Sequence, residues 1–261
     1  MKNWISPVEA AAAIGRGRGR GVRIAVLDSG IEMSHPAFAG RPLCDDLAIV
    51  EDGHKLKVVP GGGRDLFGHG TAVAGIIRHV APEAEIGSIR VLGESLSART
   101  AIILEGARQA IDRGYHILNC SLGCGVLEHV LKYKAWVDEA YLRGVHVVAA
   151  CNNADYGRPE WPAFFTSVLT VNMARSEDRR EVFYKPGHHV EFSAYGVDVE
   201  VPWAGGATKK VTGSSFAAPR VTGMLACLLS EVPDVDPLQA KALFQRLALP
   251  WSREIMAPNE R

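Results

Sequence analysis

The sequence lacks a net charge, since its 261 residues include 29 basic and 29 acidic ones. A balanced chain has no bulk field to recruit nucleic acid or an anionic membrane, so neither is an expected partner. The sequence also lacks an uninterrupted apolar run of the ~18 residues that a membrane-spanning helix needs. Residues 1–7 lack the charged and then long apolar regions of a secretory signal, which favours a cytoplasmic location.

Cysteine is scarce, with five residues at Cys44, Cys120, Cys124, Cys151 and Cys227. An odd, scattered set cannot pair completely, and it indicates free thiols in a reducing compartment. No second cysteine pair and no His-x-x-x-His sequence accompanies Cys120 and Cys124, so we expect no zinc site. No cofactor is indicated elsewhere in the sequence.

The composition, 47% hydrophobic and 22% charged, suits a globular chain with one large core. Short β-branched runs alternate with longer helical patterns, which predicts an α/β fold with a mostly parallel central sheet and helices on both faces. We expect a single domain at 22–248, after an N-terminal arm and Gly/Arg turn at 1–21 and before a tail at 249–261. The predicted strands are 22–27, 86–92, 117–121, 145–150 and 168–172, and the predicted helices are 98–113, 127–143 and 215–230.

Residues 15–21 alternate glycine and arginine. Such a segment can be an arm that contacts RNA or phosphate. It can also be a solvated turn that leads into the first strand. With only three arginines and no other sign of nucleic-acid binding, the turn is the favoured interpretation.

Three segments carry the residue types of hydroxyl-based peptide hydrolysis. Asp28 ends the first predicted strand within Val-Leu-Asp-Ser-Gly, where open α/β sheets place their sites. His69 opens a small-residue helix within Gly-His-Gly-Thr-Ala-Val-Ala-Gly, and Ser215 starts a helix within Gly-Ser-Ser-Phe-Ala-Ala-Pro. A serine nucleophile, an imidazole base and an orienting carboxylate form the triad that this chemistry needs.

In this order and at these spacings, the three motifs resemble those of the subtilisin-like serine proteases, the subtilases. The resemblance covers nearly the whole chain and implies a serine endopeptidase acting on peptide or protein substrates. It implies Ser215 as nucleophile, His69 as general base and Asp28 as the carboxylate that holds the His69 tautomer. Ser214 and Arg220 replace a usual threonine and histidine, and neither change removes a catalytic group.

The resemblance also implies an oxyanion hole made by the Ser215 backbone N–H and an asparagine side chain. The strand and loop at 144–153 resemble the family segment that ends Ala-Ala-Ala-Gly-Asn. Aligned from Gly144, Asn153 takes the asparagine position and Asn152 replaces the glycine. We therefore expect Asn153 to be the donor, with Asn152 as the alternative and a plain turn as the non-functional interpretation.

Substrate contacts follow from the same resemblance. Ser121, Leu122 and Gly123 are expected to form one edge for an extended peptide, and the 93–97 region the other. Glu160 precedes Trp161-Pro162, which resembles a family Tyr-Pro pair, and would lie at the floor of the S1 pocket. A carboxylate there predicts lysine or arginine at P1. Alternatively, Glu160 points to solvent or pairs with Arg158.

The sequence departs from the family pattern at two places. Only about twenty residues precede the first strand, so we expect no inhibitory pro-domain unless the chain has been trimmed. The segment after the His69 helix runs directly into Ala81-Pro82-Glu83-Ala84 and leaves no room for a calcium-binding loop. No metal site is expected there.

We thus expect a cytoplasmic endopeptidase, with a dedicated precursor peptide as a candidate substrate. Two alternatives remain at this point. One is a catalytically silent subtilase module that binds peptides. The other is an acyl-transfer variant that ligates peptides.

Overall fold

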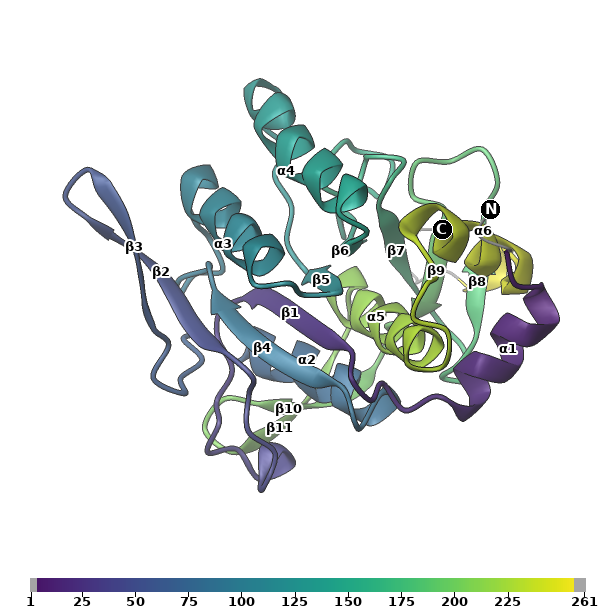
Figure 1. The fold of residues 1–261 in the computed structure, drawn as a ribbon, viewed down its shortest axis with the longest axis horizontal. Coiled ribbons are helices and arrows are strands. Elements are labelled where there is room, and N and C mark those ends of the chain that lie inside the picture. Colours follow the sequence, from purple (N-terminus) through teal and green to yellow (C-terminus); the bar gives the residue numbers. More distant parts are fainter. Residues whose placement is uncertain (1–3, 256–261) are drawn as a thin grey trace.

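Parallel strands form the centre of the fold, which a computed structural model describes for residues 4–255 (Figure 1). The strand β1 (Arg23–Asp28) lies between β4 (Glu85–Arg90) and β5 (Ile117–Cys120), and β6 (His146–Ala150) pairs with β5. These runs are nearly continuous in apolar residues because both faces of the sheet are covered. Since the strands are parallel, their carboxyl ends meet at one edge, where the loops gather polar side chains.

The remaining strands extend the sheet on both sides. Over the described residues its order is β12-β8-β9-β7-β6-β5-β1-β4-β2-β3, ten strands in all, and β10 and β11 form a separate hairpin. The pairs β2–β3 and β8–β9 are antiparallel. These outer strands are β2 (Asp46–Asp52), β3 (Lys55–Pro60), β7 (Leu169–Ala174), β8 (Val182–Tyr184), β9 (Phe192–Tyr195), β10 (Val199–Trp203), β11 (Ala207–Val211) and β12 (Leu249–Pro250).

Helices cover both faces of the sheet, as Figure 1 shows. Successive β1 residues alternate between two hydrophobic clusters, because Cβ atoms in a strand point to opposite faces: Ile24 and Val26 join one, Ala25 and Leu27 the other. The first cluster includes the helices α1 (Pro7–Arg16), α2 (His69–Val80), α5 (Ser214–Glu231) and α6 (Pro237–Leu247). The second includes α3 (Thr100–Asp112) and α4 (Val130–Leu142). Short 3-10 turns occur at Pro36–Phe38, Leu127–His129 and Arg253–Ile255.

The predicted strands correspond to β1, β4, β5, β6 and β7, and the predicted helices to α3, α4 and α5. The α/β class with one mostly parallel sheet is confirmed. The other outer strands, β2, β3 and β8 to β12, and the helices α1 and α6 were not predicted. The strand β3 shows why. In this strand, residues that are only partly buried alternate with exposed lysines, so it lacks the continuous buried apolar run of a central strand.

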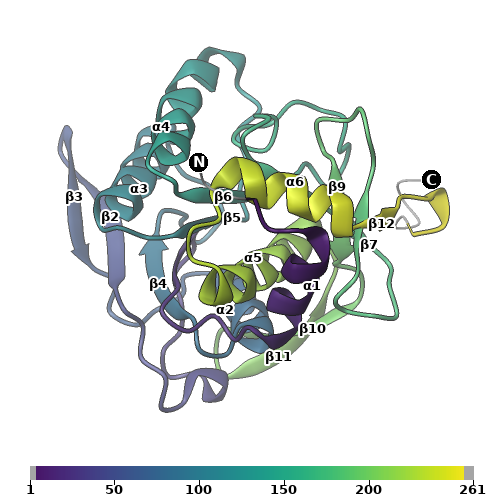
Figure 2. The same cartoon turned by 45° about the vertical axis from the view of Figure 1, so that its right-hand side comes forward.

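The segment at 1–21 differs from the expected arm and turn, because residues 7–16 form the helix α1. Ser6 caps this helix through a reciprocal capping box with Glu9, and Pro7 occupies the first helical turn. Ala10 and Ala13 are buried against α5 and α6, visible in Figure 2 as the neighbours of α1. The small alanines let this helix approach closely, so it belongs to the core.

The expected tail also has structure where it is described. Leu249 and Pro250 pair with β8 as the short parallel strand β12, and residues 256–261 lie outside the described residues. Within residues 4–255, no helix combines the length and apolarity that crossing a bilayer requires.

Candidate active site

Asp28 and His69 meet at the carboxyl edge of the sheet. Asp28 is the last residue of β1, and His69 is the first residue of α2. The His69 Nδ1 atom lies 2.8 Å from Asp28 Oδ1 and 2.9 Å from Oδ2. A carboxylate only accepts hydrogen bonds, so Nδ1 carries the proton and Nε2 is left as the basic nitrogen. Both side chains are buried, with Asp28 0% and His69 6% exposed.

Gly70 explains how α2 reaches the end of β1. A Cβ atom at this position would lie 2.1 Å from the Gly30 carbonyl oxygen and 3.2 Å from Asp28 Cβ. Only glycine allows this approach of the helix to the strand end. The small-residue run around His69 therefore brings the imidazole to Asp28.

Asp65 is a second carboxylate in this network, and sequence reasoning missed it. It accepts hydrogen bonds from the Gly68 and Thr71 backbone N–H groups and from the hydroxyls of Thr71 and Ser29. It therefore holds the first turn of α2. An acidic residue just before a predicted helix was the available signal.

The pKa of His69 is raised by these neighbours. Burial alone lowers it, but the negative charge and hydrogen bond of Asp28, and then the charge of Asp65, outweigh burial. The imidazolium form is thus stabilised beside two carboxylates, as a base that must accept a proton requires.

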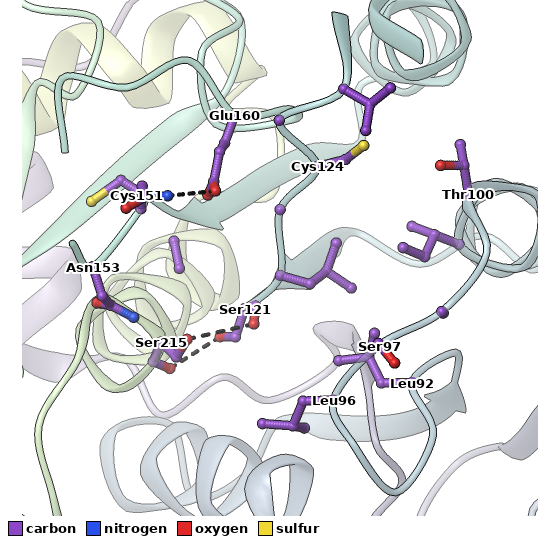
Figure 3. A pocket seen from close by; sticks show the side chains of 18 of the residues that line it. Leu92, Leu96, Ser97, Thr100, Ser121, Cys124, Cys151, Asn153, Glu160 and Ser215 are labelled. Carbon is purple, nitrogen blue, oxygen red and sulfur yellow. Dashed lines mark hydrogen bonds between the residues drawn. The ribbon is translucent and has the colours of Figure 1, made fainter. Parts of the chain in front are cut away.

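Ser215 is the second residue of α5, and it borders the same cleft as His69. Its Oγ donates to the Ser121 carbonyl oxygen at 3.5 Å, and the Ser121 hydroxyl donates to the Ser215 carbonyl oxygen at 3.0 Å (Figure 3). Among the described residues, Ser215 forms no hydrogen bond to His69. The structure thus brings Asp28 and His69 together, while Ser215 is hydrogen-bonded to Ser121 just after the neighbouring strand β5.

The adjacent asparagines after β6 have different partners. Asn153 Oδ1 accepts the Ser214 backbone N–H at 2.7 Å, and Figure 3 shows the nitrogen end of its amide turned toward Ser215. Asn152 Oδ1 accepts two backbone N–H groups in its own loop, and its Nδ2 donates to Glu160 at 2.6 Å. Both ends of the Asn152 amide are therefore occupied, whereas the Asn153 N–H₂ group is directed to the serine.

A cleft of about 660 Å³ runs past these groups. Ser121, Leu122 and Gly123 border it directly after β5. Leu96 and Ser97 line it as well, which brings the two predicted substrate edges to the same cleft. Two backbone segments on one cleft can accept an extended peptide as an added strand.

Glu160 projects into this cleft (Figure 3). Its Oε1 accepts the Asn152 bond, and its Oε2 lies so near Gly123 that a Cβ there would approach it to 2.7 Å. Within the described part of the chain, neither Arg158 nor any other arginine or lysine lies within ion-pair distance of this carboxylate. Glu160 thus borders the cleft and forms no ion pair with Arg158.

Other cleft residues had no sequence signal. Thr100 Oγ1 lies 2.8 Å from His129 Nδ1, and Cys124 Sγ lies 3.8 Å from the same nitrogen. Cys124 and Thr100 line the far end of the cleft. No group of three or more side chains among residues 4–255 is arranged to hold a metal ion.

Comparisons with known proteins agree on one family. A model described as the subtilase family matches residues 19–256. M-protease from Shouchella clausii (strain KSM-K16) is 34% identical over 249 residues, which cover 91% of this chain but only 62% of that protein. Subtilisin Savinase from Lederbergia lenta is 34% identical over 249 residues, covering 91% of this chain and 87% of that protein. A crystal structure of a cold adapted subtilisin-like serine proteinase matches with a TM-score of 0.73 at 28% identity, over 88% of this chain and 83% of that one.

Proposed function

Because this chain belongs to the subtilase family of subtilisin-like serine proteases, we propose that it cleaves peptide bonds as an endopeptidase through an acyl-enzyme on Ser215. The observation that carries this proposal is the buried pair of His69 and Asp28, 2.8 Å apart, beside a serine at the start of a helix. This is two thirds of a triad already hydrogen-bonded, with the third group in the same cleft.

In this mechanism the Ser215 hydroxyl first leaves the Ser121 carbonyl and turns to His69 Nε2. The oxygen attacks the scissile carbonyl carbon, and its proton passes to Nε2 while Asp28 stabilises the imidazolium. Collapse of the tetrahedral intermediate breaks the C–N bond, and His69 protonates the leaving amine. Water then attacks the acyl-enzyme with His69 again as base, which regenerates Ser215.

We assign the oxyanion hole to Asn153 Nδ2 and the Ser215 backbone N–H. The hydrogen bond from Ser214 N–H to Asn153 Oδ1 supports this assignment, because it fixes the amide with its donor end toward the serine. Asn152 is better described as a positioning residue, since its amide joins its own turn to Glu160.

We further propose that Glu160 selects lysine or arginine at P1. Its carboxylate accepts one neutral hydrogen bond, from Asn152, and has no cationic partner among the described residues. An uncompensated carboxylate in a cleft favours a cationic side chain and disfavours an apolar one. A narrow preference of this kind fits an enzyme that processes a dedicated precursor peptide.

A cytoplasmic location is part of the same proposal. The thiols of Cys44, Cys120, Cys124 and Cys227 are free, which suits a reducing compartment. Comparison of newly formed N-termini in cells with the active enzyme and with Ser215→Ala tests this role. A few cytoplasmic cleavage sites after lysine or arginine support it, and broad cleavage without a P1 preference contradicts it.

The silent-module alternative has one observation in its favour, the Ser215 Oγ bond to Ser121 O in place of a bond to His69. Labelling with a fluorophosphonate separates the two. An enzyme is labelled at Ser215, and the label is lost in Ser215→Ala and strongly reduced in His69→Ala. A folded protein without label at Ser215 would reject the protease proposal.

A further inference from the structure

A second cavity of about 520 Å³ is lined by cationic side chains from four parts of the chain. It lies where α1, α2 and α5 come together with the loop between β7 and β8, and Figure 2 shows the three helices adjacent. No acidic residue is among those that line it. The cationic residues are Arg16, Arg18, His79, Arg179, Arg180 and Arg220.

Three of these guanidinium groups have no counter-ion. Arg16 and Arg18 pair with Glu231 and Glu83, at 3.5 Å and 2.5 Å. In contrast, no carboxylate of residues 4–255 lies within 4.0 Å of Arg179, Arg180 or Arg220.

Two acids of the loop form hydrogen bonds within it. Asp178 accepts the Arg180 backbone N–H at 2.8 Å, and Glu181 accepts the Ser176 hydroxyl at 2.6 Å. Both carboxylates therefore hold the loop, and neither forms an ion pair with Arg179 or Arg180.

Arg220 shows that this positive charge is built into the fold. It is only 4% exposed on α5, its Nε donates to the Tyr195 carbonyl oxygen at 2.9 Å, and its guanidinium lies 4.6 Å from the Tyr195 ring. Burial, and then the charge of Arg179, lower the pKa of Arg220 to about 10. Burial followed by the charges of Arg220, Arg179 and Arg180 also lowers the pKa of His79.

Helix ends do not account for this charge. The carboxyl ends of α1 and α2 border the cavity and each contribute about half a negative charge. Together they offset about one of the three unpaired guanidinium charges, which leaves about two positive charges. A dianion matches that remainder, and a phosphate group with its several acceptor oxygens matches the planar guanidinium donors.

The cavity also has an apolar side. Ile14, Met224 and Leu247 line it and also line an adjoining cavity of about 260 Å³. Arg180 borders both cavities, and Glu181 borders the adjoining one. A ligand there can place an anionic group at the arginines and an apolar group along the helices.

We propose that this cavity binds a small organic phosphate, with its phosphate held by Arg179, Arg180 and Arg220 and its apolar part along Ile14, Met224 and Leu247. The Gly/Arg segment then contributes Arg16 and Arg18 to the rim of the site. This site is separate from the cleft at Ser215 and does not depend on the proposed protease activity.

The test is isothermal titration calorimetry of the full chain with phenyl phosphate and with inorganic phosphate, at pH 8 and constant ionic strength set with chloride. We expect one saturable site, and tighter binding of phenyl phosphate than of inorganic phosphate. Arg179→Gln and Arg180→Gln each remove a charge-assisted hydrogen bond and are expected to weaken binding about tenfold or more. Both side chains are exposed, so these variants keep the fold.

Arg175→Gln is the matched control. Arg175 is exposed in the same loop but lines a different cavity, so its variant is expected to bind within twofold of the unchanged chain. An absence of saturable heat overturns the site, as does an equal loss of affinity in Arg175→Gln and Arg179→Gln. Phenyl phosphate binding no tighter than inorganic phosphate overturns the assignment of an organic ligand.

Discussion

At the scale of single residues, the site depends on how neighbouring polar groups divide their hydrogen bonds. Asn152 and Asn153 have the same side chain, yet one closes a turn and the other borders Ser215. Asp28 and Asp65 are both carboxylates near His69, yet only Asp28 touches its ring, while Asp65 holds the helix that carries it. The partner, and not the residue type, assigns each role.

Asn153→Ala is expected to lower kcat by about 10² to 10³-fold with a small effect on KM, because it removes a donor used mainly in the transition state. Steady-state kinetics on a peptide substrate measures this. Asn152→Ala is the matched control and should retain most of kcat. Equal losses in the two variants would contradict the assignment of the oxyanion hole.

Glu160→Gln is expected to remove the preference for arginine at P1, because it removes the charge and keeps a carbonyl oxygen that can accept the Asn152 bond. We expect the ratio of kcat/KM for arginine over leucine substrates to fall about tenfold or more, the scale of a charge-assisted hydrogen bond. Arg158→Gln should leave the ratio unchanged, since Arg158 does not pair with Glu160. An unchanged ratio in Glu160→Gln would rule out its role in specificity.

The acid limb of kcat/KM is expected to have its midpoint above 6.5, the ordinary pKa of His69, since Asp28 and Asp65 outweigh burial and raise it. The base must be neutral, so activity falls as the pH drops through this pKa. Asp65→Asn removes a negative charge that favours imidazolium, and it should move the limb to lower pH. Asp155→Asn, which changes a carboxylate on the exposed loop beside the cleft, should leave the acid limb at the same pH. A limb that stays in place in Asp65→Asn contradicts this assignment.

At the scale of elements, neighbouring glycines of the Gly/Arg segment at 15–21 differ in whether a side chain would fit. Gly15 lies inside α1, and a Cβ there meets nothing within 4 Å. At Gly17 a Cβ would lie 2.1 Å from the Cys227 carbonyl oxygen of α5. The segment therefore contains the point at which α1 ends against α5. A side chain is tolerated at Gly15 and excluded at Gly17.

Gly17→Ala is expected to lower the free energy of unfolding by about 1–3 kcal/mol, because the added methyl group overlaps backbone that cannot move freely. Gly15→Ala should raise it by about 0.5–1 kcal/mol, since alanine favours the helix. Urea denaturation of both variants measures the difference. Two similar small effects would show that the segment is only a solvated turn.

At the scale of the whole molecule, we expect the edge of the sheet opposite the cleft to limit stability in acid. His146 begins β6, is 3% exposed, and its Nε2 lies 3.2 Å from the Val235 carbonyl oxygen before α6. Its Nδ1 is buried without a hydrogen-bond partner. Burial is the main cause that lowers the pKa of His146 to about 4, although the Val235 bond and Asp236 oppose it.

The folded state therefore holds His146 neutral at pH values where the unfolded chain protonates it. The resulting stability is complete above the unfolded pKa of about 6.5 and is lost as the pH falls toward 4. Between pH 7 and 4.5 the loss from this group is on the order of 2 kcal/mol. His146→Gln keeps a donor for Val235 and should reduce the pH dependence of urea denaturation by that amount. An unchanged dependence would mean that other groups control acid stability.

The central part of the fold could be predicted from the sequence, because its signals are local. Buried parallel strands such as β5 and β6 are short continuous apolar runs, and helices such as α3 follow them with their own period. Outer strands such as β3 and the helix α1 could not be predicted. β3 is half exposed, and α1 is an alanine-rich helix that depends on α5 and α6 for its burial.

By itself, the sequence determined the α/β class, the family resemblance, and the residues that stand at strand ends and helix starts. The end of a strand and the start of a helix are each set by a few neighbouring residues. The sequence could therefore place Asp28 at a strand end and His69 and Ser215 at helix starts. The tertiary structure decided between the alternatives that the sequence left open for Asn152, Asn153 and Glu160. It alone showed that Asp65 supports His69 and that three arginines without a counter-ion share a cavity. Those outcomes depend on packing between segments far apart in the chain, which no local pattern encodes.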